Sequence, residues 1–145
     1  LYDLQNIINT NTDDATKATA AQFGSNANQI AIARILKAYY YMVLSDAFGD
    51  VPYSEALQGK AVIPYDKQEN VYPAIITELK EAVAQFDGGL TVQGDVMYGG
   101  NTTKWKKFAN SIRAIAALRM SKANATLGKT EFAAAIAAAT PALNN

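Results

Sequence analysis

Residues 30–57, IAIARILKAYYYMVLSDAFGDVPYSEAL, decide the fold of this chain. Apolar side chains lie on nearly every side of a helix drawn through its first part, and the thin polar strip that remains is Arg34, Lys37, Tyr41 and Ser45. A helix that is apolar on nearly all sides is one around which others pack. Gly49 can adopt the left-handed conformation that ends a helix, and Pro52 prevents the helix from resuming. The stretch therefore predicts a buried central helix that ends in a stiff turn.

The rest of the chain predicts more helices and no sheet. Apolar residues recur at helical spacing, and no segment shows sustained two-residue alternation. We expect an all-α fold, a helical bundle or a tetratricopeptide-like helical repeat, with three long helices and short flanking ones. The chain reads as a single helical domain, 1–145, with 1–28 partly loop and a weak helix at 1–8; the other helices are expected at 29–48, 67–86, 103–124 and 131–139.

Local sequence signals mark the helix ends. Asp66 and Glu69 have the spacing of a capping box, which places the start of the second long helix. Pro73 would then either bend that helix or fall in the first turn of a restarted one. Asn101 or Thr103 can cap the third long helix. Gly128 is expected to separate that helix from a short alanine-rich one.

Composition excludes several classes of function. The chain has 145 residues, 13 basic and 13 acidic, with no cysteine and no histidine. A zero net charge gives no reason to expect a nucleic acid partner. Disulfides, thiolate nucleophiles and the usual zinc ligands are absent, so we expect no cofactor. The longest apolar run, 38–44, is too short to cross a bilayer.

A possible calcium loop in the N-terminal part fails on inspection. Asn9, Asn11 and Asp13 alternate as the first ligands of an EF-hand loop would. However, Asp14 stands where glycine is required, and Ala20 where the bidentate glutamate should be. We therefore predict no metal site.

Three blocks of sequence resemble one protein family. They are KAYYYMVLSDAFGDVPYSEAL at 37–57, IPYDKQENVYPAIITELKEAVAQF at 63–86 and GDVMYGGNTTKWKKFANSIRAIAALRMS at 94–121. In this order they resemble the helical core of the SusD/RagB family of outer-membrane nutrient-binding lipoproteins. Members of that family are several times longer, so the chain resembles an internal portion. One departure is Ile115, where the family commonly has a second arginine.

The resemblance implies a function without catalysis. It implies a core of tetratricopeptide-type helix pairs in a subunit at the extracellular face of the outer membrane. The subunit would bind an oligosaccharide or related nutrient and deliver it to a SusC-like TonB-dependent transporter. Its contact with the membrane would be only through a lipid anchor that is not present in this chain.

Aromatic residues are the first candidates for a sugar site because sugar rings stack on exposed aromatic faces. Tyr53, Tyr65 and Tyr98 lie in the two predicted loops and, with Asp95, are the candidate ligand-binding residues. Anchoring a loop against the helices is an equally good reading for these tyrosines. The other aromatic residues fall on predicted apolar helix faces and are expected in the core: Tyr39, Tyr40, Phe48, Trp105 and Phe108.

Charged residues suggest contacts rather than chemistry. Asp50, Glu55, Asp66 and Asp95 lie in loops, but their spacing does not set one as acid and another as base for glycoside hydrolysis. We therefore expect no catalytic residues. Lys104, Lys106 and Lys107 are read as a solvated face. Arg113 and Arg119 are expected to pair with a carboxylate or a helix-end carbonyl of a neighbouring element.

Two other classes of function remain open from the sequence. A helical-repeat adaptor would bind peptides along a concave surface and be indifferent to sugars. A fragment of an (α/α) glycan-processing enzyme would need paired carboxylates facing one cleft.

Overall fold

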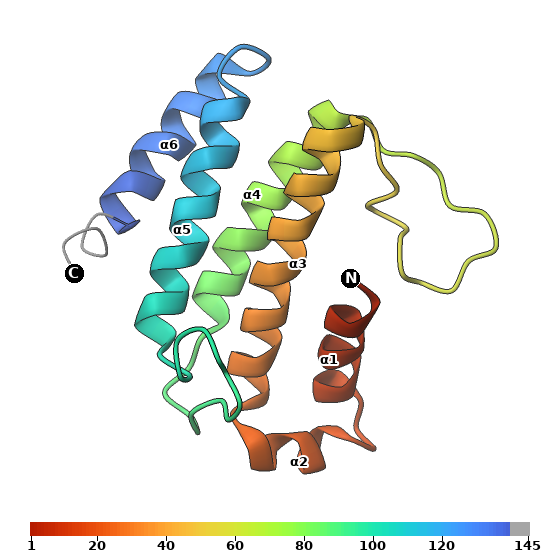
Figure 1. Ribbon diagram of the computed structural model, residues 1–145, viewed down its shortest axis with the longest axis vertical. Coiled ribbons are helices and arrows are strands. Elements are labelled where there is room, and N and C mark those ends of the chain that lie inside the picture. The colour runs from red at the N-terminus through yellow and green to blue at the C-terminus, as the bar shows by residue number, and fades with distance from the viewer. Residues whose placement is uncertain (140–145) are drawn as a thin grey trace.

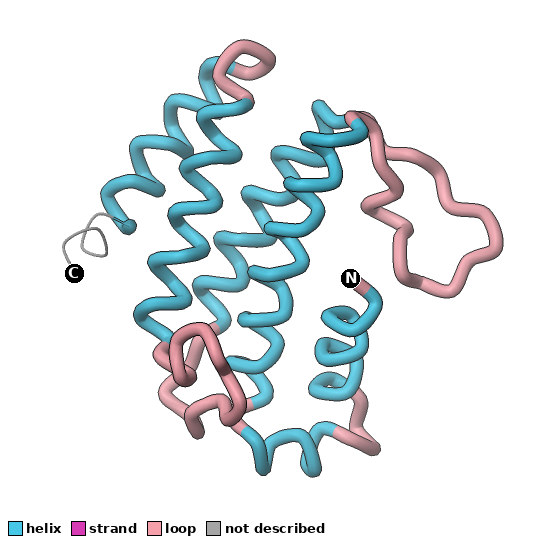
Figure 2. Tube along the Cα trace, in the orientation of Figure 1, coloured by secondary structure: helices cyan, strands magenta, loops and turns pink. Residues whose placement is uncertain are grey.

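The chain is all-helical, as predicted. The computed structural model describes residues 1–139, and no strand occurs among them. The helices are α1 (Tyr2–Thr12), α2 (Lys17–Ala20), the 3-10 helix η1 (Ala21–Phe23), α3 (Asn26–Phe48), α4 (Gln68–Gln85), α5 (Thr102–Arg119) and α6 (Ala125–Ala139). Figure 1 shows α3 to α6 side by side in chain order, with alternating direction, and α1 on the other side of α3. Figure 2 shows the long loop between α3 and α4 extending beside α1.

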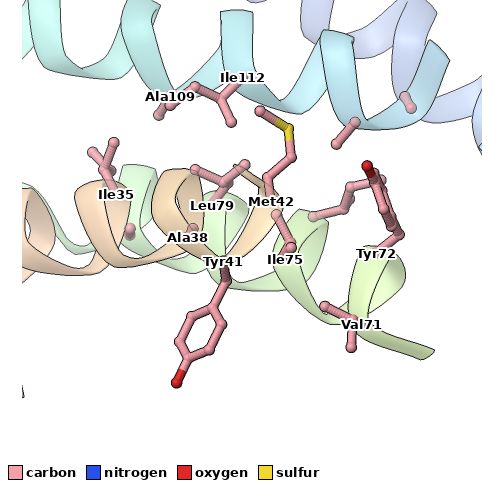
Figure 3. Close-up of a cluster of buried hydrophobic side chains, with 14 of the residues drawn as sticks. Ile35, Ala38, Tyr41, Met42, Val71, Tyr72, Ile75, Leu79, Ala109 and Ile112 are labelled. Carbon is pink, nitrogen blue, oxygen red and sulfur yellow. The ribbon is translucent and has the colours of Figure 1, made fainter. Parts of the chain in front are cut away.

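The core lies between α3, α4 and α5. Buried residues recur three and four positions apart on each helix, which is the spacing of one helix face. They are Ala31, Ile35, Ala38 and Met42 on α3, Val71, Ile75, Leu79 and Ala82 on α4, and Trp105, Ala109, Ile112 and Ala116 on α5 (Figure 3). Alanine at several of these positions lets the helix backbones approach closely.

Two of the aromatic residues predicted for the core are not there. Tyr40 is 49% exposed and Phe48 is 75% exposed, whereas Tyr41, assigned to the polar strip, is buried. The reason is that α1 and the loop after α3 cover the face that bears Tyr41, and consecutive residues of a helix point about 100° apart. Tyr39 and Phe108 are half-buried and pack against the core, with ring centroids 6.2 Å apart.

The start of α4 differs from the predicted capping box. Asp66 lies before the helix and does not cap it. Its carboxylate instead accepts hydrogen bonds from the amides of Tyr53 (3.0 Å) and Ser54 (2.8 Å). The first amide of α4, that of Gln68, donates to Asp50 Oδ1 across 2.9 Å. The acid before the loop, Asp50, thus caps the helix after it, and the acid at the end of the loop, Asp66, binds amides near its start.

The other helix ends follow identifiable local chemistry. Gly49 ends α3 with a φ of 75°, as expected. Asn101 caps α5, accepting from the Lys104 amide at 3.0 Å. Pro73 lies inside a continuous α4. The predicted break at Gly128 is wrong, because α6 runs through this residue from Ala125 to Ala139. A Cβ at 128 would lie 2.9 Å from the carbonyl oxygen of Ala117, so glycine allows the close packing of α6 on α5.

Both predicted arginine contacts are present. Arg113 Nε donates to Glu131 Oε2 of α6 at 2.6 Å, and Arg119 pairs with Asp46 of α3. Glu131 is only 7% exposed and also accepts from Lys80 of α4 at 3.0 Å. Burial alone would raise the pKa of Glu131, but the bonds from Lys80 and Arg113 outweigh it and hold that pKa below its usual value. The same bonds connect α4, α5 and α6.

Replacing Trp105 with alanine should strongly destabilise the fold. Trp105 is 1% exposed, and its Nε1 donates to Asp95 Oδ2 across 2.7 Å. Loss of a buried tryptophan costs about 3–5 kcal/mol of unfolding free energy. Denaturant unfolding followed by circular dichroism measures this. Leu118→Ala, at a 59% exposed position of α5, is the control and should change stability by less than ~0.5 kcal/mol. Equal effects of the two changes would contradict the assignment of Trp105 to the core.

Acid should release the loop between α3 and α4 before the helices unfold. The pKa of Asp66 is lowered, mainly by the hydrogen bond from the Ser54 amide. A carboxylate with a lowered pKa stabilises the loop above its unfolded pKa of about 3.9, and that stabilisation is lost as the pH falls through the lower folded value. The amide resonances of Tyr53 and Ser54 should therefore shift together below about pH 4 in an NMR titration. In the Asp66→Asn variant, the Tyr53 and Ser54 amide resonances should already have their low-pH chemical shifts at neutral pH. Resonances that stay fixed until global unfolding would refute this role.

Candidate functional site

The two loops that hold the predicted ligand residues lie at opposite ends of the helical array. The loop with Tyr53 and Tyr65 follows the end of α3 and lies beside α1 (Figure 1). The loop with Asp95 and Tyr98 lies near the start of α3, where the Ser25 amide donates to the Leu90 carbonyl at 2.8 Å. The structure therefore does not bring the four residues together.

Asp95 and Tyr98 organise their own loop. The Asp95 carboxylate accepts from the amides of Met97 (2.9 Å) and Gly100 (2.8 Å), in addition to the Trp105 indole. The Tyr98 ring is half-buried and meets the Trp105 ring edge-on, with centroids 5.1 Å apart. This cluster uses the carboxylate and the ring for anchoring, so it offers little to a ligand.

A polar groove at the other end is the better candidate site. It has a volume of about 650 Å³ and lies between α1, α3 and the loop before α4. The lining residues are mostly polar or aromatic: Tyr2, Gln5, Asn9, Lys37, Tyr41, Tyr53, Ser54, Ala56, Leu57, Gln58, Gly59 and Glu78. Of the predicted ligand residues, only Tyr53 belongs to this polar groove.

Two of the three tyrosines that line the polar groove, Tyr41 and Tyr53, pack on each other. The rings of Tyr41 and Tyr53 meet edge-on, with centroids 4.7 Å apart. Figure 3 shows Tyr41 pointing from α3 away from the core cluster. Neither hydroxyl makes a hydrogen bond to any residue within 1–139, and neither is sealed from solvent. Burial raises the pKa of both, so both stay neutral and can donate to a ligand.

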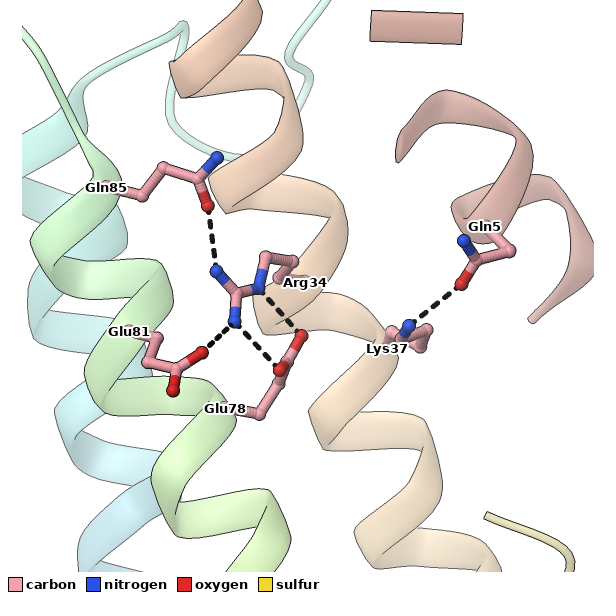
Figure 4. A network of polar contacts seen from close by, with 6 residues as sticks. All are labelled: Gln5, Arg34, Lys37, Glu78, Glu81 and Gln85. Carbon is pink, nitrogen blue, oxygen red and sulfur yellow. Dashed lines mark hydrogen bonds and ion pairs between the residues drawn. The ribbon is translucent and has the colours of Figure 1, made fainter. Parts of the chain in front are cut away.

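Lys37 is the cation of the polar groove. Its ammonium donates to Gln5 Oε1 of α1 at 2.9 Å, which links α1 to α3 (Figure 4). Burial lowers the pKa of Lys37, an effect that Glu78 opposes and Arg34 reinforces. An ammonium carries three donors, so Lys37 retains hydrogen-bonding capacity for a ligand.

Glu78 is held by an arginine behind the polar groove. Arg34 binds Glu78 through two parallel hydrogen bonds of 2.8 and 2.9 Å, and also contacts Glu81 and Gln85 (Figure 4). Two-point pairing of this kind fixes geometry as well as charge. Glu78 is therefore a positioned acceptor, and it shares the charge of Arg34 with Glu81.

The loop carboxylates are engaged in structural contacts. Asp50 caps α4, Asp66 binds the Tyr53 and Ser54 amides, and Glu55 pairs with Lys60 at 2.8 Å. Among the residues that the structure describes, Glu78 is the one carboxylate that lines the polar groove. Residues 1–139 also contain no group of three potential metal-ligating acids. The arrangement is suited to binding a polar, uncharged molecule by hydrogen bonds and ring contacts.

Sequence reasoning missed most of the polar groove. Gln5 and Asn9 come from α1, which runs to Thr12, whereas the sequence predicted a weak helix at 1–8 and a partly looped segment up to 28. Asn9 was considered only as a calcium ligand, in a pattern that failed. Lys37 and Tyr41 belong to the polar strip predicted for this helix. That strip is the one sequence feature that distinguishes this face of α3 from its apolar core faces. Tyr65 lies outside the polar groove, 72% exposed.

Comparison with known proteins identifies the family. A family model described as "Starch-binding associating with outer membrane", of SusD-like type, matches residues 1–145. None of the helices within 1–139 is long and apolar enough to cross a membrane. No curated protein matches the chain.

Solved structures give the same family. A Bacteroidetes AC2a SusD-like protein is 37% identical, with a TM-score of 0.77 over 94% of this chain and 24% of that one. A chitin-binding protein is 33% identical, with a TM-score of 0.80 over 94% of this chain and 28% of that one. A SusD homologue from Bacteroides uniformis ATCC 8492 is 34% identical, with a TM-score of 0.71 over 84% and 26%. This chain thus spans about a quarter of their length, and it belongs to the SusD-like family.

Proposed function

We propose that the chain is part of a subunit that binds an oligosaccharide without cleaving it, and that the polar groove contacts the sugar. The observation that carries the proposal is the pair of tyrosine hydroxyls, Tyr41 and Tyr53, in a groove lined with amides, within a chain of a family described as starch-binding. The neighbouring structures named as chitin-binding also support a glycan ligand.

The chemistry of the polar groove matches that of a sugar. A pyranose presents apolar C–H faces and a rim of hydroxyls that both donate and accept hydrogen bonds. Tyrosine rings offer an apolar face with a polar tip. Gln5, Asn9 and Gln58 carry amides, which donate and accept side by side. A preformed groove with a few placed polar groups is the usual design of a small-molecule site.

The wider role proposed is nutrient capture at the extracellular face of the outer membrane. The family description places its members in association with that membrane. In this proposal a lipid anchor elsewhere in a longer protein holds the subunit there, and a SusC-like TonB-dependent transporter receives the ligand. Delivery requires movement of the subunit against the transporter and no bond cleavage.

Tyr53→Phe should weaken sugar binding without unfolding the chain. The change keeps the ring that packs on Tyr41 and removes only the hydroxyl, so a loss of about threefold to tenfold in affinity is expected for one hydrogen bond. Isothermal titration calorimetry with maltooligosaccharides and chitooligosaccharides measures this, with thermal melting as the check on folding.

Tyr98→Phe is the matched control. It makes the same chemical change in the loop at the opposite end and should leave affinity unaltered. Binding that is lost in Tyr98→Phe and kept in Tyr53→Phe would place the sugar in the other loop. Absence of binding to any oligosaccharide would refute the proposed function.

The proposed partner can be tested by co-purification. A tagged full-length protein containing this chain should retain a large TonB-dependent outer-membrane transporter after gentle detergent extraction. Mass spectrometry of the retained proteins identifies it. Recovery of the protein alone, under conditions that preserve other outer-membrane complexes, would contradict the partnership.

A further inference from the structure

An apolar cavity adjoins the polar groove. Its volume is about 660 Å³, and its walls come from the end of α3 and from the loop before α4. Leu44, Phe48, Pro52, Ile63 and Tyr65 form much of its surface. Most of the lining is hydrocarbon or aromatic, in contrast to the amides and charges of the polar groove.

The two cavities share three lining residues, Tyr41, Ala56 and Leu57. A molecule seated in the polar groove therefore has the apolar cavity within reach across this shared wall. Tyr41 thus contributes to the walls of both cavities.

The shared wall contains an unusual backbone conformation. Leu57 has a φ of 64°, and it is the one non-glycine residue within 1–139 with a positive φ. A branched side chain is rarely held in this left-handed region, and such strain concentrates at ligand-binding sites. The residue that adopts it here lines both cavities.

The apolar cavity also leaves large aromatic groups in contact with water. Phe48 is 75% exposed and Tyr65 is 72% exposed. Clustered exposed apolar side chains mark binding surfaces more often than isolated ones do. The misassignment of Phe48 to the core follows from this, because the residue is apolar but faces a cavity open to solvent.

We propose that the polar groove and the apolar cavity form one composite site for a saccharide that carries an apolar substituent, such as an alkyl, acyl or aryl group. The sugar occupies the polar groove and the substituent crosses Leu57 to lie against Phe48 and Tyr65. The inference rests on the proposed function for its saccharide half and adds the class of ligand.

Calorimetry with a matched set of ligands tests the composite site. The probes are maltose, n-octyl β-maltoside and an octyl oligoethylene glycol ether, which has the same tail and no sugar, all below their micelle concentrations. Octyl maltoside should bind at least tenfold more tightly than maltose, since burial of two or three methylenes accounts for about that factor. Diacetylchitobiose and its 4-methylumbelliferyl glycoside form a second pair for a chitin-type sugar.

Two exposed residues provide the variant, and a third provides its control. The double change Phe48→Ala and Tyr65→Ala should abolish the gain from the tail and leave the affinity for the plain sugar as it was. Phe23→Ala, at a 57% exposed position beyond the opposite end of α3, should affect neither. Circular dichroism verifies that all variants are folded.

The outcomes separate this inference from the proposed function. If the plain sugars bind and the tail adds nothing, or the gain persists in the double variant, the composite site is refuted and the proposed function stands. If the octyl ether binds as tightly as octyl maltoside and no plain sugar binds, the apolar cavity is an independent surface and both are refuted.

Discussion

Helix α3 packs against α1, α4 and α5, and the layout of the candidate site follows from this, whereas α6 packs on α5. Ala31, Ile35 and Ala38 face α4 and α5 and are 0–1% exposed. On another side, α1 packs along the helix and Tyr53 packs on Tyr41. Burial of apolar surface is the dominant favourable term in folding. Because α3 carries apolar surface on several sides, α1 and the loop before α4 pack on the side that α4 and α5 leave uncovered. There they form the polar groove.

Carboxylates hold the irregular parts of the chain in place. Asp50 caps α4, Asp66 binds the loop amides that follow Pro52, and Asp95 gathers three amides and an indole. A buried or turn-forming backbone amide must find an acceptor, and a charged one forms the stronger bond. Glu55 pairs with Lys60 instead, so the loop acids considered above are all engaged in structural contacts within residues 1–139.

The sequence was sufficient for the three long helices and their contacts through arginine, but not for the helices within 9–28, the start of α6 at Ala125 or the candidate site. Helical periodicity identifies the buried faces of α4 and α5 because apolar residues recur three and four positions apart along each helix. The fate of Phe48 and Tyr41 could not be read in this way, since it depends on which side of α3 receives α1 and the loop. Gly128 shows the same limit. The local sequence predicts that this glycine breaks a helix, whereas the structure shows that it allows close approach to the Ala117 carbonyl of the neighbouring helix. Gln5 and Glu78 both line the polar groove although they are 73 positions apart in the sequence. Only the packing of α1 and α4 on α3 brings them together.

If the polar groove binds a ligand as proposed, the anchoring of the loop and that binding are thermodynamically linked. Asp66 fixes the Tyr53 and Ser54 amides, and the antiparallel bridge between Val51 and Asp66 closes the loop with bonds of 3.2 and 2.9 Å. Both Tyr53 and Ser54 also line the polar groove. A ligand that binds only the anchored loop must stabilise the ionised form of Asp66, and by reciprocity protonation of Asp66 must weaken that ligand. Preorganisation of this wall before binding reduces the ordering cost that a flexible loop would impose on affinity. A carboxylate that never touches the ligand can therefore set how tightly the polar groove holds it.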